Sequence, residues 1–276
     1  MKKAEKDLAK KIKSNSKHFW AHVNSKIKTK QFIPDLVCPE TNQVCTDDAD
    51  KANILSDHFR SVFTKEENDS VPEISQYHPS SILEDLLITE EMVLDKLTQM
   101  NIAKSAGPDG VHPRVLKEAA AEFTKPLTVL FNQSLKTGKV PQKWKEAHVT
   151  AIHKKGPKTN PQNYRPISLT SVVCKVFESI MRNHIMDYLM RNNILSSKQY
   201  GFMAKRSTTL QLLKVLETWT EIIDSGGQID CAYLDFKKAF DSVPTKGLLL
   251  KYNLLESKVI FLLGSKTTLK IAHSKY

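Results

Sequence analysis

The sequence predicts an α+β fold in which helices surround a few short strands. Two short β-rich runs, Ala147–His153 and Tyr164–Leu169, flank a polar loop, and a third run, Ile229–Phe236, follows the turn at Gly226-Gly227. Turn residues on both sides of each run are typical of strands, and the first two runs are expected to form a β-hairpin. Because apolar residues recur at helical spacing elsewhere and no internal repeat is present, the α+β class follows.

Helix-capping residues mark several of the expected helices. Thr89 can cap a helix whose first turn is acidic, and Pro113 occupies the favoured first turn of the next helix. Pro126 is expected to break or kink that helix, and a further helix is expected to end at Gly138. By apolar spacing, helices are also expected over residues 1–30, 50–63, 171–191 and 208–224.

Turn and linker signals divide the chain. The stretch Ser105–Gly110 must be a tight turn, because two glycines and a proline leave little else available. Residues 64–81 are polar and contain Pro72 and Pro79, which indicates a linker. We therefore expect a helical N-terminal extension with its linker over residues 1–81, and a second domain over residues 82–276.

Positive charge is concentrated in two parts of the chain. The formal net charge is +11, but residues 1–30 carry +8, residues 31–100 carry −11 and residues 101–200 carry +10. A basic arm and a basic body predict a polyanionic partner, although solubility charge on a solvated helix explains the arm equally well. With no signal peptide and no membrane-spanning run, we expect an intracellular protein of the cytoplasm or nucleus that makes no membrane contact.

Asp235 is a candidate metal ligand. It lies in Tyr233–Phe236 at the end of the third predicted strand, where a carboxylate beside an apolar sheet must be solvated, paired or bound to a cation. Mg²⁺ prefers carboxylate oxygens and needs few protein ligands. Spacing alone favours the alternative, a helix N-cap that follows a strand.

The polar loop of the predicted hairpin is a candidate phosphate-binding segment. Basic residues lie on it or beside it, namely Lys154, Lys155, Lys158 and Arg165. A flexible loop of this kind can close over a triphosphate, and arginine can bind phosphate through two parallel hydrogen bonds. The alternative is a solvated loop without a ligand.

A second basic segment combines aromatic and charged residues. Gln199–Phe202 is followed by Lys205 and Arg206. Aromatic side chains beside basic ones can stack on bases and hold phosphates, as single-strand-binding surfaces do. Packing of Phe202 in the core explains the same pattern equally well.

Five sequence blocks resemble the reverse transcriptases of LINE-type (non-LTR) retrotransposons. In the order and approximate spacing of that family, they are SAGPDG at 105–110, VTAIHKKG at 149–156, NYRPISLTSVVCKVFESI at 163–180, QYGFMAKRSTT at 199–209 and YLDFKKAFDSV at 233–243. Residues 49–64 are similar to the linker that precedes the polymerase in such elements. The resemblance implies an incomplete right-hand polymerase fold, with fingers and the first part of the palm after a helical N-terminal extension.

The resemblance also implies a function and a set of site residues. The function is RNA-directed DNA polymerase activity by two-metal nucleotidyl transfer with Mg²⁺, or alternatively Mn²⁺, on an RNA template, a DNA primer and deoxynucleoside triphosphates. The metal ligands would be Asp235 and the backbone carbonyl of Phe236, and Phe240 would pack against the sugar of the incoming nucleotide. Implied triphosphate ligands are Lys154, Arg165 and, in an alternative register, Lys155; implied template contacts are Gly201, Phe202 and Arg206.

The sequence departs from the family pattern after the YLDFKKAFDSV block. Glu256 is the only acidic residue after Asp241, so the later Asp-Asp pair that completes the family's active site is absent from the 276 residues. We therefore expect a chain truncated after the first catalytic motif and inactive alone, without the C-terminal polymerase part and endonuclease domain of an intact element. The alternatives are a non-catalytic RNA- or DNA-binding remnant and the translated product of a pseudogene.

Overall fold

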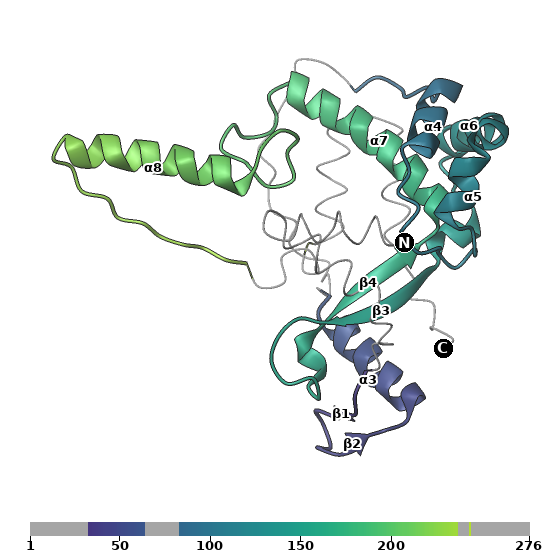
Figure 1. Ribbon diagram of the computed structural model, residues 1–276, viewed down its shortest axis with the longest axis horizontal. Coiled ribbons are helices and arrows are strands. Elements are labelled where there is room, and N and C mark those ends of the chain that lie inside the picture. The colour runs from purple at the N-terminus through teal and green to yellow at the C-terminus, as the bar shows by residue number, and fades with distance from the viewer. Residues whose placement is uncertain (1–32, 64–82, 237–242, 244–276) are drawn as a thin grey trace, which may run out of the picture.

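The computed structural model describes residues 33–63, 83–236 and 243 (Figure 1). Its elements in chain order are β1 (Leu36–Val37), β2 (Val44–Cys45), α3 (Asp48–Ser61), α4 (Glu90–Thr98), α5 (Pro113–Glu118), α6 (Ala120–Thr137), η1 (Gln142–Lys145), β3 (Ala147–His153), η2 (Pro161–Asn163), β4 (Tyr164–Thr170), α7 (Val172–Arg191) and α8 (Thr208–Asp224). The two sheets seen among these residues have two strands each, so the described part of the chain is the predicted mixture of helices and short strands. The basic helix expected over residues 1–30 and the linker at 64–81 lie outside the described residues.

Polar side chains begin the helices where the sequence predicts caps. The Thr89 hydroxyl accepts a hydrogen bond from the Met92 N–H at the start of α4. Ser171 and Ser207 make the equivalent bonds at the starts of α7 and α8. Each bond satisfies one of the N–H groups that lack a partner within the first turn of a helix.

Pro126 was predicted to break or kink the helix, but the break lies at Ala119, between α5 and α6, and not at Pro126. Ala119 leaves the helical conformation with φ −107° and ψ 38°, whereas Pro126 lies inside α6. A proline there removes one backbone hydrogen bond. Leu127 and Phe131 follow Pro126 and are both buried in the core. Their packing keeps this part of α6 in place despite the missing hydrogen bond. Gly138 ends α6 in the left-handed conformation, as expected from its position.

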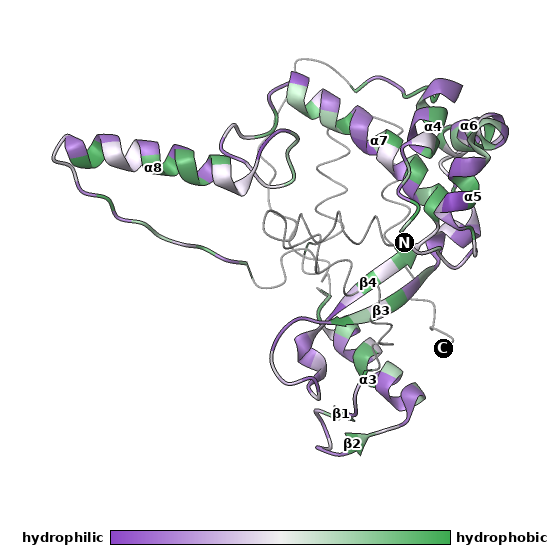
Figure 2. Cartoon of the chain, viewed as in Figure 1, coloured by the Kyte–Doolittle hydropathy of each residue, from purple (hydrophilic) through white to green (hydrophobic). Residues whose placement is uncertain are grey.

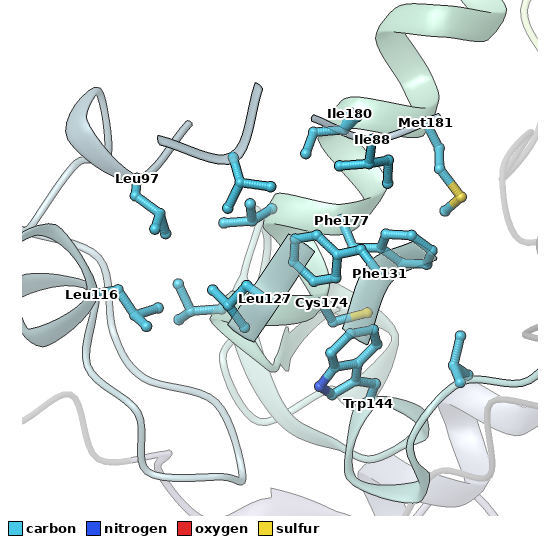
Figure 3. Close-up of a cluster of buried hydrophobic side chains, with 14 of the residues drawn as sticks. Ile88, Leu97, Leu116, Leu127, Phe131, Trp144, Cys174, Phe177, Ile180 and Met181 are labelled. Carbon is cyan, nitrogen blue, oxygen red and sulfur yellow. The ribbon is translucent and has the colours of Figure 1, made fainter. Parts of the chain in front are cut away.

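An aromatic cluster forms the centre of the main hydrophobic core, between α4, α6 and α7 (Figure 3). The rings of Phe131 and Phe177 stack with their centroids 5.0 Å apart, and the Trp144 ring lies 5.7 Å from that of Phe177. Phe131 and Phe177 are completely buried. Contacts of this kind add to the free energy that area burial alone provides, so the cluster fixes the end of α6 against α7.

The predicted β-hairpin is confirmed and connects two apolar regions of the chain. β3 and β4 pair in antiparallel register, with Ala147 opposite Thr170 and His153 opposite Tyr164. At one end, Ala147 is buried and lies close in sequence to Trp144 of the main core. At the other end, Tyr164 packs with Leu36, Leu55 and Phe59 in a second, smaller cluster. Figure 1 shows the hairpin extending from α3 toward the helices of the main core.

The tight turn predicted at Ser105–Gly110 packs against the end of β4. Gly110 has φ +69°, and its N–H donates to the Gly107 carbonyl at 3.0 Å. A Cβ atom on Gly107 would lie 2.5 Å from the Thr170 carbonyl oxygen. Gly107 is therefore required because the backbone of β4 approaches too closely for any side chain.

The strand predicted over Ile229–Phe236 is absent, since residues 228–236 have no regular secondary structure. A strand is stabilised by a hydrogen-bonded neighbour, and none lies beside this segment among the described residues. Tyr233, Leu234 and Phe236 are accordingly more than four-fifths exposed.

Helix α8 forms as predicted but has no buried residue among those described. Figure 2 shows hydrophobic residues along its whole length, and several of its leucines are about half exposed or more: Leu210, Leu212, Leu213 and Leu216. Among the described helices, none is long and apolar enough to span a bilayer.

The contact at Gly107 gives a stability prediction. Gly107→Ala should lower the free energy of unfolding by about 1–3 kcal/mol, because the added methyl group forces the turn away from β4. Gly201→Ala is the matched control, since a Cβ there meets nothing within 4 Å. Urea unfolding followed by circular dichroism measures both; an equal, small effect of the two variants would contradict the packing argument.

Candidate nucleotide and nucleic-acid site

The basic loop, residues 154–163, is held in place by its own hydrogen bonds rather than being flexible. The Asn163 amide donates to the Pro157 carbonyl at 2.8 Å, and the Tyr164 hydroxyl donates to the Lys158 carbonyl at 2.7 Å. The His153 ring hydrogen bonds to the Gly156 carbonyl at 2.9 Å. Gly156 itself has φ +81° and lies so close to Asn163 that a Cβ would be 2.7 Å from its amide nitrogen. The loop therefore has a defined shape before any ligand is bound.

The two faces of the hairpin differ in chemistry. In antiparallel strands, directly paired residues point to the same face. Tyr164 and His153 are paired on the face that packs toward α3, whereas Arg165 and Ile152 are paired on the opposite face. Burial raises the pKa of the Tyr164 hydroxyl above its ordinary value. Arg165 and Ile152 are exposed.

Lys154 extends the hairpin by one residue. Its N–H donates to the Asn163 carbonyl at 2.8 Å, so the pairing continues past the last residue of β3. Strand alternation then puts the Lys154 side chain on the same face as Arg165. Lys155 and Lys158, by contrast, belong to the folded part of the loop.

The positive charge of this loop is not neutralised by the part of the chain that the structure describes. Within that part, ion pairs join Lys51 to Asp48, Arg114 to Glu118, Lys143 to Glu146 and Lys214 to Glu217. None of the four basic residues of the hairpin loop takes part in them. An ordered loop with exposed, unneutralised cations attracts anions, and a lysine with an arginine on one face suits a phosphate group.

The segment around Gly201 forms a compact turn that Arg206 holds together. Arg206 Nη1 donates to the carbonyls of Ser197 and Gln199 at 2.5 Å and 2.6 Å, and its guanidinium lies 5.4 Å from the centre of the Tyr200 ring. Arg206 was predicted to contact the template, but its guanidinium is hydrogen bonded to carbonyls of its own loop. Gly201 is exposed, and a Cβ there would meet no other atom within 4 Å.

Phe202 projects from this turn and is not a core residue. It is 79% exposed and has φ +61°, a conformation that bulky side chains rarely adopt. Core packing, one of the two explanations that the sequence left open, is therefore wrong for Phe202. The aromatic ring of Phe202 is thus directed outward, and Lys205 of the same segment also has a positive φ, of 60°.

Asp235 lies in the irregular segment after α8, at the surface of the described chain. Among the described residues, no three His, Cys, Asp or Glu side chains gather closely enough to hold a metal ion. The described residues therefore offer one carboxylate, and next to it the carbonyl of Phe236, but not a complete metal centre. A hydrogen bond with Cys231 raises the pKa of nearby Tyr233. Phe240 lies outside the described residues.

Residues that shape the site were missed by reasoning from the sequence. The N–H of Val37 donates to the Thr159 carbonyl at 2.8 Å, so β1 contacts the basic loop directly. Asn163 and Tyr164 also shape the loop, through side-chain hydrogen bonds to the carbonyls of Pro157 and Lys158. The contact from β1 had no local signal, because the partners are far apart in the sequence.

Comparison with known proteins connects this site to a polymerase family. Residues 152–269 match the sequence profile of the family described as reverse transcriptase (RNA-dependent DNA polymerase). The chain is 30% identical over 165 residues to a Drosophila melanogaster protein named "Probable RNA-directed DNA polymerase from transposon BS". It is 29% identical over 165 residues to the RNA-directed DNA polymerase from the mobile element jockey of the same species. Each match covers 59% of this chain but only 18% of the relative, so the chain spans about a fifth of their length.

The role of Arg206 within its loop gives a second prediction. Arg206→Lys should raise amide hydrogen exchange across residues 196–205 about fivefold, because lysine cannot donate to two carbonyls and stack on Tyr200 at once. The exposed Lys198→Ala serves as the control, since it removes a neighbouring charge and no described side-chain contact. Unchanged exchange in Arg206→Lys would show that the guanidinium does not hold the loop.

Proposed function

We propose that this chain belongs to a reverse transcriptase of the non-LTR retrotransposon type and has a role in RNA-directed DNA synthesis. In this proposal, residues 82–276 supply the fingers and the first part of the palm of a right-hand polymerase. Residues 1–81 form an extension before them. The partners are an RNA template, a DNA primer and deoxynucleoside triphosphates.

The observation that carries the proposal is the pair of cations at the loop end of the hairpin. Lys154 and Arg165 lie at facing ends of β3 and β4, and both fall within the residues that match the reverse transcriptase family. An arginine fork with a lysine on the same face can bind the oxygens of a triphosphate while the strands fix their spacing. Lys155 on the adjoining loop provides a further charge. This set would bind and orient the incoming nucleotide.

Gly201, Phe202 and Arg206 are proposed to contact the template. The outward Phe202 ring offers a surface on which a base can stack. Gly201 has no side chain that would obstruct a nucleic-acid strand lying beside it. Arg206 would act through the shape of the loop, since its guanidinium is bound to the carbonyls of that loop.

Asp235 is proposed as one ligand of a catalytic Mg²⁺, or of Mn²⁺, with the carbonyl of Phe236 as a second. Hard cations of this kind prefer such oxygens, and when bound in a polymerase they activate the attacking hydroxyl and stabilise the leaving pyrophosphate. Phe240 is proposed to pack against the sugar of the nucleotide. Two cations need more than one carboxylate, and Glu256 is the only acidic residue after Asp241 within the 276 residues, so we expect the set of carboxylates in these residues to be incomplete.

A second candidate function is binding of RNA or DNA without catalysis. The single carboxylate at Asp235, without two further ligands among the described residues, favours it for this chain in isolation. The basic loop and Phe202 would then bind nucleic acid, and the chain would contribute no chemical step. The product of a decayed gene copy would have the same features.

Triphosphate binding tests the role of the hairpin cations. Lys154→Ala and Arg165→Ala should each weaken binding of dTTP with Mg²⁺ about tenfold, because each removes a charge-assisted hydrogen bond at a solvent-exposed site. Lys136→Ala, an exposed lysine at the end of α6, is the matched control. Equilibrium dialysis gives the affinities. Equal affinities of all three variants and the wild-type chain would exclude the proposed nucleotide site.

A primer-extension assay separates catalysis from binding alone. The 276-residue chain should not extend a DNA primer on an RNA template with Mg²⁺, because its carboxylate set is incomplete. Its affinity for the same template should fall steeply with salt, with a logarithmic slope of roughly −0.7 to −0.9 per phosphate contact. Primer extension by the chain that is lost in Asp235→Ala would refute the expectation of no catalysis. A template affinity that does not change with salt would refute the expectation of phosphate binding. Extension restored by a separate fragment with the missing carboxylates would identify the chain as half of an active site.

A further inference from the structure

We propose that residues 33–61 brace the basic loop 154–163 in the shape that binds a triphosphate, and that Tyr164 is the positioning residue through which this brace acts. The inference rests on the proposed function of that loop. It concerns residues that precede the part of the chain matching the reverse transcriptase family, which begins at residue 152.

The brace reaches the loop first through its backbone. The Val37 N–H donates to the Thr159 carbonyl at 2.8 Å. Val37 is held in turn by the small hairpin in which it pairs with Val44. The adjacent Leu36 is completely buried, so this strand is anchored and not a free end.

The second connection runs through the Tyr164 side chain. Its ring packs in the cluster formed with Leu36, Leu55 and Phe59, and the residue is 6% exposed. Its hydroxyl donates to the Lys158 carbonyl at 2.7 Å. One side chain thus packs against the brace through its ring and holds the loop through its hydroxyl.

Together these contacts bind two consecutive carbonyls of the loop from the side of the brace. The Lys158 carbonyl accepts from the Tyr164 hydroxyl and the Thr159 carbonyl accepts from the Val37 N–H. The opposite face, with Lys154 and Arg165, is left open for a ligand. A loop that already has its bound shape loses less conformational entropy when the ligand arrives, so bracing raises affinity. The brace would therefore influence nucleotide binding without touching the nucleotide.

The test uses the full chain and compares Tyr164→Phe with the matched change Tyr188→Phe. Tyr188 is also a buried tyrosine, but it lies in α7. Tyr164→Phe keeps the packed ring and removes only the hydroxyl, so amide exchange across residues 154–163 should rise about fivefold. Binding of dTTP with Mg²⁺ should weaken in the same variant by roughly two- to fivefold, since the competent loop shape is less populated. The thermal midpoint should fall no further than it does in Tyr188→Phe.

The outcomes separate this inference from the proposed function. If Tyr164→Phe leaves loop exchange unchanged, or raises it without weakening dTTP binding, the brace is overturned while the effect of Lys154→Ala on dTTP affinity stands. If Lys154→Ala has no effect on dTTP binding, the nucleotide site itself fails and the inference fails with it. Faster exchange and weaker binding in Tyr164→Phe, with neither in Tyr188→Phe, support a positioning role and not a general loss of stability.

Discussion

A two-stranded hairpin is only marginally stable in water, so β3–β4 depends on what covers its inner face. The structure covers it at both ends with different parts of the chain. Near Ala147 the hairpin meets the region of the main core, and Gly107 packs against Thr170 at that same end. At the other end, Tyr164 lies among apolar residues of β1 and α3. The register of the hairpin, and with it the spacing of Lys154 and Arg165, is fixed by burial at these two points.

The features that could be predicted from the sequence are those that depend on neighbouring residues. Thr89 was predicted to cap α4 and accepts from the N–H three residues later, and Gly138 ends α6 through its own conformation. Such signals are present in any short window of sequence. The two strands of the hairpin were recognisable for a similar reason, because turn residues flank each run.

The features that could not be predicted depend on distant partners. The segment at Ile229–Phe236 has the composition of a strand, but a strand needs a neighbour, and composition does not supply one. The contact between Val37 and Thr159 joins parts of the chain that no periodicity connects. The same limit applies to the site: the roles expected of Lys154, Arg165 and Asp235 came from the resemblance of the ordered sequence blocks, whereas the internal role of Arg206 became visible only from its hydrogen bonds.

The candidate site residues therefore differ in how firmly the described part of the chain holds them in a fixed position. The basic loop is preorganised by hydrogen bonds and by packing, so its contribution to binding does not wait for a ligand. Asp235 lies on an irregular segment, and no group of three or more His, Cys, Asp or Glu side chains that could hold a metal ion is found among the described residues. In the proposed function, phosphate binding and metal chemistry would therefore depend on different parts of the structure, and a change in one part need not alter the other.

Helix α8 has a consequence for how this chain folds during its synthesis in the cell. The N-terminal part of a chain leaves the ribosome first. The core built from residues 83–194 can therefore fold before α8 has fully emerged. The leucines of α8 then remain exposed, because no described residue buries them. An apolar helix face of this kind is a binding site for chaperones and a start point for aggregation. The yield of folded protein would then depend on how soon α8 is covered after synthesis.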